Sequence, residues 1–123
     1  ALGQPLGAMT DAPHGGTVAA STPYVIGWTL PVCVDKFARV AGILDPSAMN
    51  LTESERAQRL PEILKRLFTT LGVTDTFRSY GLRVEQIDDF AQTVWTSFNQ
   101  DLACHPKKIN SKEEVADIIR MCF

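Results

Sequence analysis

Two histidines are the side chains of this sequence whose type and setting could support catalysis or metal binding. His14 lies between Pro13 and Gly15, directly before a stretch of small residues where a ligand could approach the backbone closely. His105 follows much later, beside Pro106. The sequence contains no HExxH, GxSxG or GxGxxG motif and no phosphate-binding loop, so no common local motif assigns either imidazole a role. A lone histidine more often forms hydrogen bonds within the fold than it binds a metal, and both interpretations stay open at this point.

The element that must position His14 is an expected helix over residues 15–28. This segment is rich in small residues and carries no charged side chain. A helix that is apolar or small on every side is typical of one buried among other helices, so we expect it to be central, with Pro23 removing one internal hydrogen bond. Tyr24 and Trp28 lie four residues apart on it and form either an aromatic wall of a binding site or part of the core.

Four further stretches repeat apolar residues with helical spacing, and no stretch alternates with the period of a strand. Thr52 and Glu55 have capping-box spacing at the start of one of them, and Gly72 follows it as a natural stop. Pro61 predicts either a kink there or two shorter helices. Ser111 begins another stretch, again with a glutamate three residues later. The fold class is therefore all-α, a multi-helix bundle, with stripes that include Val34–Leu44, Leu60–Leu71, Ile87–Phe98 and Val115–Cys122.

Composition narrows the function classes. The chain has 123 residues, 12 basic and 14 acidic side chains and 45% hydrophobic residues, which suits a single domain over 1–123. The weakly acidic balance argues against a nucleic-acid partner, and no apolar run is long enough to span a membrane. The three cysteines are odd in number, far apart and without a CxxC pair, which favours a reducing, cytoplasmic setting with two thiols in the core and one near a loop.

Several segments, in the same order, resemble the C-terminal helical domain of the iron-containing alcohol dehydrogenase family. The Pro-His-Gly segment before a small-residue helix is the most specific of them, and together they extend over nearly the whole chain. The matching segments are Pro5-Leu6-Gly7, Asp11-Ala12-Pro13-His14-Gly15, Thr22-Pro23-Tyr24-Val25, Lys36–Ala41, Leu71-Gly72-Val73, Phe77–Leu82, His105-Pro106-Lys107 and Ser111–Phe123.

The resemblance implies a metal site of which this sequence holds one part. Members of the family bind one iron(II) or zinc ion through an aspartate and three histidines, and the metal polarises an alcohol or carbonyl oxygen while NAD(P) exchanges a hydride. Only His14 matches a ligand position. The family's spacing places the preceding ligand one position before Ala1, and the N-terminal dinucleotide-binding domain is absent from this sequence. We therefore expect the isolated chain to hold no metal or nucleotide cofactor and to lack dehydrogenase activity.

Three positions depart from the family pattern. Gln4 stands where many members have a further histidine, His105 replaces the asparagine of the family's "NPR" loop, and Asp101 stands where members often carry a cysteine close to the substrate. These changes reflect either drift within the family or a new pocket in which His14, Asp101 and His105 perform acid–base chemistry, since an aspartate beside an imidazole can orient it. In the second case Gln4 and the aromatic residues Tyr24 and Trp28 are candidate substrate-binding residues.

Two functional hypotheses remain. In the first, the chain is the metal-binding helical domain of an iron-dependent alcohol dehydrogenase, active on alcohols or aldehydes only with its nucleotide-binding half. In the second, a free-standing homologue binds a small apolar molecule between its helices, as a binding protein or a metal-free isomerase, cyclase or lyase. Both hypotheses predict exposed apolar faces on some helices. Because such faces usually mark an interface, we expect a homodimer or a separate nucleotide-binding chain.

Overall fold

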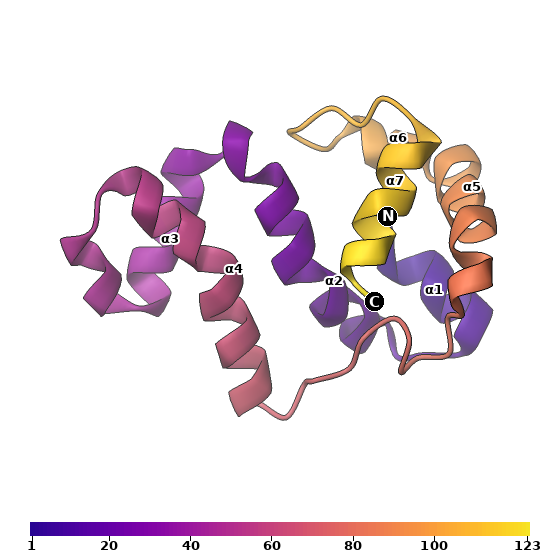
Figure 1. The fold of residues 1–123 in the computed structure, drawn as a ribbon, viewed down its shortest axis with the longest axis horizontal. Helices are drawn as coiled ribbons and strands as arrows, with labels where there is room; N and C mark the ends of the chain where they lie inside the picture. Colours follow the sequence, from indigo (N-terminus) through magenta and orange to yellow (C-terminus); the bar gives the residue numbers. More distant parts are fainter.

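The structure is a computed structural model that describes residues 1–123, and it confirms the all-helical prediction. Its seven α-helices are joined by turns and three short 3₁₀ segments, and it has no strand (Figure 1). None of the helices is both long and apolar enough to cross a membrane. The helices are α1 (Gly3–Thr10), α2 (His14–Thr29), α3 (Val34–Leu44), α4 (Glu53–Thr70), α5 (Ile87–Ser97), α6 (Asn99–Ala103) and α7 (Lys112–Met121).

Helix α2 occupies the centre, as its composition predicts. It packs against α1, α4 and α7, whereas α3 packs mainly on α4. Figure 1 shows the α3–α4 pair on one side of α2, and α1, α5 and α7 on the other. The α2 helix continues through Pro23, which is buried within it. Helix α2 is thus the element that joins the two parts of the molecule.

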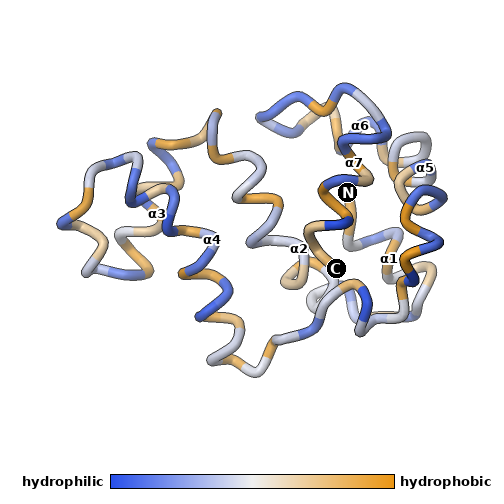
Figure 2. Tube along the Cα trace, viewed as in Figure 1, coloured by the Kyte–Doolittle hydropathy of each residue, from blue (hydrophilic) through white to orange (hydrophobic).

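Each side of α2 has its own hydrophobic cluster. The larger one contains 15 buried residues, among them Phe77 and Phe90, whose rings pack edge to face with centroids 6.3 Å apart. The smaller one joins α3 and α4 through Ala41, Leu60, Ile63 and Leu64. Figure 2 shows the orange, hydrophobic stretches of α5 and α7 in the larger part. Most of the apolar burial therefore stabilises the α1–α5–α7 side.

Capping residues and a glycine define the ends of α4, and a partial capping box marks the start of α7. The Thr52 hydroxyl accepts a hydrogen bond from the Glu55 amide, and the Glu55 carboxylate accepts one from the Thr52 amide, so the predicted capping box forms. Gly72 adopts a φ of +75°, a left-handed conformation that favours glycine and ends the helix. Helix α4 passes through Pro61 without interruption, so the alternative of two shorter helices is wrong. At α7 only half of the box forms, because Glu114 accepts from the Asn110 amide instead of the Ser111 amide.

Two expectations about burial are wrong. The apolar stripe of α4 predicts burial up to Leu71, yet Leu71 is 66% exposed and stands just after Thr70, the last residue of the helix. Helix α2 is not buried on all sides either: Val18 is 41% exposed and Gly27 is exposed. The sequence pattern does not predict the short helix α6, since its five residues are too few to show a periodic stripe.

Candidate functional site: a groove beside the central helix and an exposed histidine at its start

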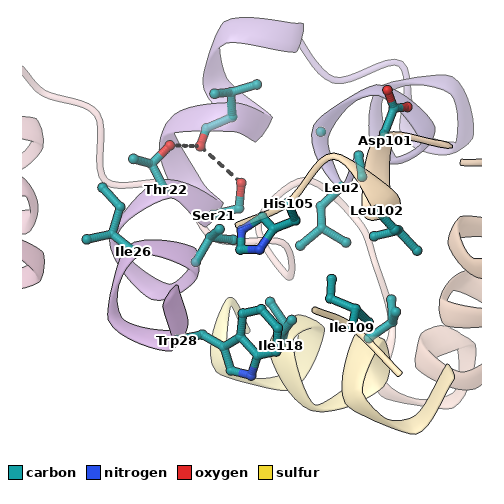
Figure 3. A pocket seen from close by; sticks show the side chains of 15 residues that line it. Leu2, Ser21, Thr22, Ile26, Trp28, Asp101, Leu102, His105, Ile109 and Ile118 are labelled. Carbon is teal, nitrogen blue, oxygen red and sulfur yellow. Dashed lines mark hydrogen bonds between the residues drawn. The ribbon is translucent and has the colours of Figure 1, made fainter. Parts of the chain in front are cut away.

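A groove of about 240 Å³ lies beside α2, against α1, α6, α7 and the loop that follows α6 (Figure 3). We call it the α2 groove. Hydrophobic side chains dominate its lining, which brings Asp101, His105 and Trp28 together, as one of the sequence hypotheses requires. The lining residues are Ala1, Leu2, Gly3, Val18, Ser21, Thr22, Val25, Ile26, Trp28, Asp101, Leu102, His105, Ile109, Val115 and Ile118.

His105 is held by hydrogen bonds at both of its ring nitrogens. Nδ1 lies 2.9 Å from the carbonyl oxygen of Lys107 and therefore carries a hydrogen, because a carbonyl only accepts. Nε2 lies 3.1 Å from the hydroxyl of Thr29, near the C-terminal end of α2. The ring also packs against Trp28 with centroids 5.4 Å apart. The Thr29 hydroxyl also lies 2.6 Å from the carbonyl oxygen of Val25, and its one hydrogen serves either that oxygen or Nε2. These contacts fasten the loop to α2.

Lys107 reinforces the same attachment. Its ammonium group donates a hydrogen bond of 2.9 Å to the carbonyl of Trp28 and lies 4.0 Å from the centre of the indole ring. The carbonyls of the last helical turn lack intrahelical partners and carry partial negative charge, so a lysine is favourable there. Sequence reasoning does not find this role. The two residues lie 79 positions apart, and no local pattern signals the contact.

Asp101 lies at the rim of the α2 groove, on α6, with an exposed side chain. It forms no hydrogen bond to His105; the Lys107 carbonyl and the Thr29 hydroxyl orient that ring instead. Figure 3 shows the Asp101 carboxylate pointing away from the imidazole. The two residues share a groove but do not form an Asp–His pair.

His14 does not line the groove, so the hypothesis of one pocket containing His14, Asp101 and His105 needs correction. His14 is the first residue of α2, whereas His105 contacts Thr29, the last residue of the same helix. Fifteen residues of helical rise separate these ends by roughly 22 Å. The His14 side chain is exposed and has no hydrogen-bond partner in the fold, and the space beside Gly15 is open. Its imidazole is therefore free to bind something outside these residues.

The predicted substrate-binding residues are dispersed. Trp28 lines the α2 groove, but Gln4 is exposed on α1 and outside the lining. Tyr24 faces a second cavity between α2 and α4, where the ammonium group of Lys65 lies 4.6 Å from the centre of its ring. Tyr24 and Trp28 thus do not form a single aromatic wall, because each lies against a different neighbouring element.

The donor set of this chain does not complete a metal site. No group of three or more histidine, cysteine, aspartate or glutamate side chains converges anywhere in residues 1–123. A catalytic zinc or iron centre usually needs about three protein ligands. Of the thiols, Cys33 and Cys122 are buried and Cys104 is exposed, as predicted, and burial raises the pKa of Cys122 to about 12. His14 is thus available as one ligand and needs others from elsewhere.

Taken together, the fold and these residues define an all-helical domain with one unpaired histidine at the start of its central helix. The model of the iron-containing alcohol dehydrogenase family, C-terminal part, matches residues 1–123 in full. The chain belongs to this family, which confirms the resemblance found in its sequence.

Individual relatives agree with the family assignment. The chain is 27% identical over all of its 123 residues to a 1,3-propanediol dehydrogenase of Citrobacter freundii, and spans 31% of that protein. It is 30% identical over 82 residues, 67% of the chain and 21% of the relative, to long-chain-alcohol dehydrogenase 1 of Geobacillus thermodenitrificans. A crystal structure of a 1,3-propanediol oxidoreductase superposes with a TM-score of 0.87 at 24% identity, covering 99% of the chain and 31% of that protein. The chain therefore spans between about a fifth and a third of the length of these relatives.

Proposed function

We propose that the chain is the helical, metal-ligand-bearing part of an iron-containing alcohol dehydrogenase that oxidises alcohols or reduces aldehydes with NAD(P). In this proposal the activity requires a nucleotide-binding half, carried by the same polypeptide or by a partner chain. The observation that carries the proposal is the family match over the whole chain, which the alcohol dehydrogenases among the relatives support.

The geometry of His14 supports a role as one metal ligand. Its imidazole begins α2, is exposed, and forms no hydrogen bond that metal binding would have to break. A Cβ atom added to Gly15, the next residue, would meet no atom within 4 Å, so there is room for groups from another domain. Because residues 1–123 supply no further converging ligands, we assign His14 a binding role and no step of the reaction.

The alternative of a free-standing isomerase, cyclase or lyase finds no support. The relatives are alcohol dehydrogenases, and both His105 nitrogens lie within 3.1 Å of polar atoms of the fold. His14 lies at the far end of α2 from His105, so an acid–base pair between them would need a large rearrangement. A homodimer is a further proposal, since apolar residues such as Ile43 are exposed.

A fusion tests the proposed function. Residues 1–123 would replace the matched part of the Citrobacter freundii 1,3-propanediol dehydrogenase, and NAD⁺-linked oxidation of 1,3-propanediol would be followed with iron(II) present. We expect turnover from the fusion and none from residues 1–123 alone, because the chain supplies one ligand of the metal site. His14→Ala should lower kcat/KM by at least about a hundredfold, with Asn50→Ala as an exposed control. A folded fusion with bound iron and no turnover would refute the proposal.

A further inference from the structure

We propose that His105 and Thr29 form a pH-sensitive latch, which holds the loop between α6 and α7 against α2 more tightly in acid than at neutral pH. We call residues 104–111 the latch loop. His105 also lines the α2 groove, so the latch determines how firmly one wall of that groove is closed (Figure 3). The proposal concerns a conformational device within this chain, and it does not depend on the dehydrogenase activity proposed above.

Three short contacts at the latch need one hydrogen each. His105 Nδ1 lies 2.9 Å from the Lys107 carbonyl oxygen, and Nε2 lies 3.1 Å from the hydroxyl oxygen of Thr29. That hydroxyl oxygen lies 2.6 Å from the carbonyl oxygen of Val25. A neutral imidazole and a hydroxyl carry two such hydrogens between them, whereas an imidazolium and a hydroxyl carry three. Only the protonated ring therefore supplies a hydrogen to all three contacts at once.

In the neutral state one of the three contacts lacks a hydrogen. The Lys107 carbonyl only accepts, so the one ring hydrogen lies on Nδ1 and Nε2 presents a lone pair. The Thr29 hydroxyl then donates either to Nε2 or to Val25, and the contact with Val25 is the shorter. When it donates to Val25, a lone pair of the hydroxyl oxygen faces the lone pair of Nε2.

Protonation at Nε2 removes this conflict. The ring then donates to the Thr29 oxygen while the hydroxyl still donates to Val25, so the three groups form one continuous chain of hydrogen bonds. A hydrogen bond from a charged donor is shorter and stronger than one between neutral groups, and successive bonds in a chain polarise one another. The contact that joins the latch loop to α2 is therefore stronger in the protonated state.

Two features of α2 attract a positive ring at this place. Thr29 is the last residue of the helix, whose C-terminal end carries partial negative charge. The ring of Trp28 lies against His105 with centroids 5.4 Å apart, which is within the distance at which an aromatic ring attracts a cation. Both features act in the same direction as the added hydrogen, so they favour a tighter latch in acid.

The ionisable groups of the neighbouring elements are few. Asp101 on α6 and the N-terminal amine of Ala1 lie at the groove, whereas α2 and α7 contribute only uncharged residues to its lining. The latch loop itself carries Lys107, Lys108 and Cys104, of which Lys107 places its ammonium group over the Trp28 ring. This cation opposes a second positive charge, so the experiment must isolate the His105–Thr29 contact from it.

The expected direction of the pH effect follows from the count of hydrogens. Imidazoles change charge between about pH 5 and 8. As the pH falls through the titration of the ring, the latch gains its third hydrogen and the loop is held on α2. A group that bonds better when protonated stabilises the folded state on the acid side, and this contribution is lost as the pH rises. The latch loop should therefore open more often at neutral pH.

Amide hydrogen exchange tests the latch in the unaltered chain. The His105 amide donates to the Leu102 carbonyl, so its exchange reports opening at the start of the latch loop. Protection factors, which correct for the intrinsic effect of pH on exchange, would be compared at about pH 5.5 and 7.5. We expect this amide to be at least about fivefold better protected at the lower pH. Equal protection at both values, or better protection at the higher one, would overturn the proposal.

Threonine variants of α2 assign the effect to the latch. Thr29→Val keeps the shape of the side chain and removes the hydroxyl, so it should abolish the pH dependence of this protection. Thr29→Ser restores a hydroxyl and should restore the pH dependence. Thr22→Val is the matched control, because the Thr22 hydroxyl bonds the Val18 carbonyl of the same helix and does not contact His105. An unchanged pH dependence in Thr29→Val would overturn the proposal.

A double-mutant cycle measures the contact itself. Urea denaturation followed by circular dichroism would be carried out on the parent, His105→Ala, Thr29→Val and the double variant at both pH values. The cycle isolates the pair from the other ionisable groups. We expect the coupling, as a factor in the unfolding equilibrium constant, to be at least about fivefold larger at the lower pH. With His14→Ala in place of His105→Ala, the coupling to Thr29→Val should stay within about twofold of one.

A His105–Thr29 coupling that is equal at both pH values, or larger at the higher one, would overturn the proposal. The same pH-dependent coupling between Thr29 and His14 would also overturn it, because His14 lies at the other end of α2.

Discussion

Gly15 and Gly16 are neighbours in the sequence, but their surroundings differ. A Cβ atom on Gly16 would collide with the hydroxyl of Tyr80, whereas one on Gly15 would meet no atom within 4 Å. Tyr80 is fixed at that place, because its hydroxyl donates a hydrogen bond of 3.1 Å to Asp75. Burial and this carboxylate raise the pKa of Tyr80, so the phenol stays protonated and keeps donating. The small residue at position 16 thus lets the segment after α4 pack onto α2.

This contrast predicts opposite effects for two similar substitutions. Gly16→Ala should lower the free energy of unfolding by about 1–3 kcal/mol, because the Tyr80 ring must move to admit the methyl group. Gly15→Ala should be neutral or stabilising by up to about 1 kcal/mol, since alanine is the better helix former and the site is open. Urea denaturation followed by circular dichroism measures both. Equal effects of the two substitutions would contradict this account of the packing.

Sequence reasoning at this scale succeeds where a signal is local and fails where it is not. The position of His14 before a small-residue helix is visible in the sequence, and the structure leaves its imidazole unpaired. His105 lies against Thr29, which is 76 positions away in the sequence, and no local pattern around either residue indicates this contact. The role of Lys107 is missed for the same reason.

At the scale of the elements, the start of α4 depends on a capping box that also makes it sensitive to pH. Hydrogen bonds from the Thr52 hydroxyl and amide hold the pKa of Glu55 below its ordinary value of 4.5. A carboxylate whose pKa is lowered on folding stabilises the folded state above its unfolded pKa. The contribution is lost as the pH falls through the lower, folded pKa. The cap therefore stabilises α4 at neutral pH and weakens in acid.

Thr52→Ala should cost roughly 1 kcal/mol of stability at neutral pH. The difference from the parent should shrink as the pH falls below 4.5 and Glu55 takes up a proton. Thr70→Ala, in the exposed last turn of the same helix, is the control, with an expected effect within about 0.5 kcal/mol. Thermal unfolding across the acid range measures both variants. A penalty for Thr52→Ala that does not change with pH would show that Glu55 does not act through this cap.

The ends of a helix are predictable from the sequence where a capping residue or a proline marks them. The end of α3 before Asp45-Pro46 and the start of α4 after Thr52 follow from proline and capping chemistry. Periodicity alone does not predict which stripe is covered, because coverage depends on neighbours far along the chain. Leu71 continues the stripe of α4 yet is 66% exposed.

For the molecule as a whole, two features of different chemistry lie at different places along α2. At its start stands an exposed, unpaired imidazole, and along its side runs a mostly apolar groove. No group of three or more possible metal ligands converges in residues 1–123, so a metal held by His14, as we propose, would need further ligands from elsewhere. The chain covers 31% of its relative from Citrobacter freundii, and under the proposed function a nucleotide-binding half would provide those ligands.

The iron content of the fusion tests the central claim most directly. Metal analysis after dialysis should find about one iron per fusion chain and none bound stoichiometrically to residues 1–123 alone. His14→Ala in the fusion should weaken iron retention by roughly tenfold or more, whereas His105→Ala should not, because His105 bonds to the Lys107 carbonyl and the Thr29 hydroxyl. Iron held one-to-one by residues 1–123 alone, or retained equally by the fusion without His14, would contradict the account.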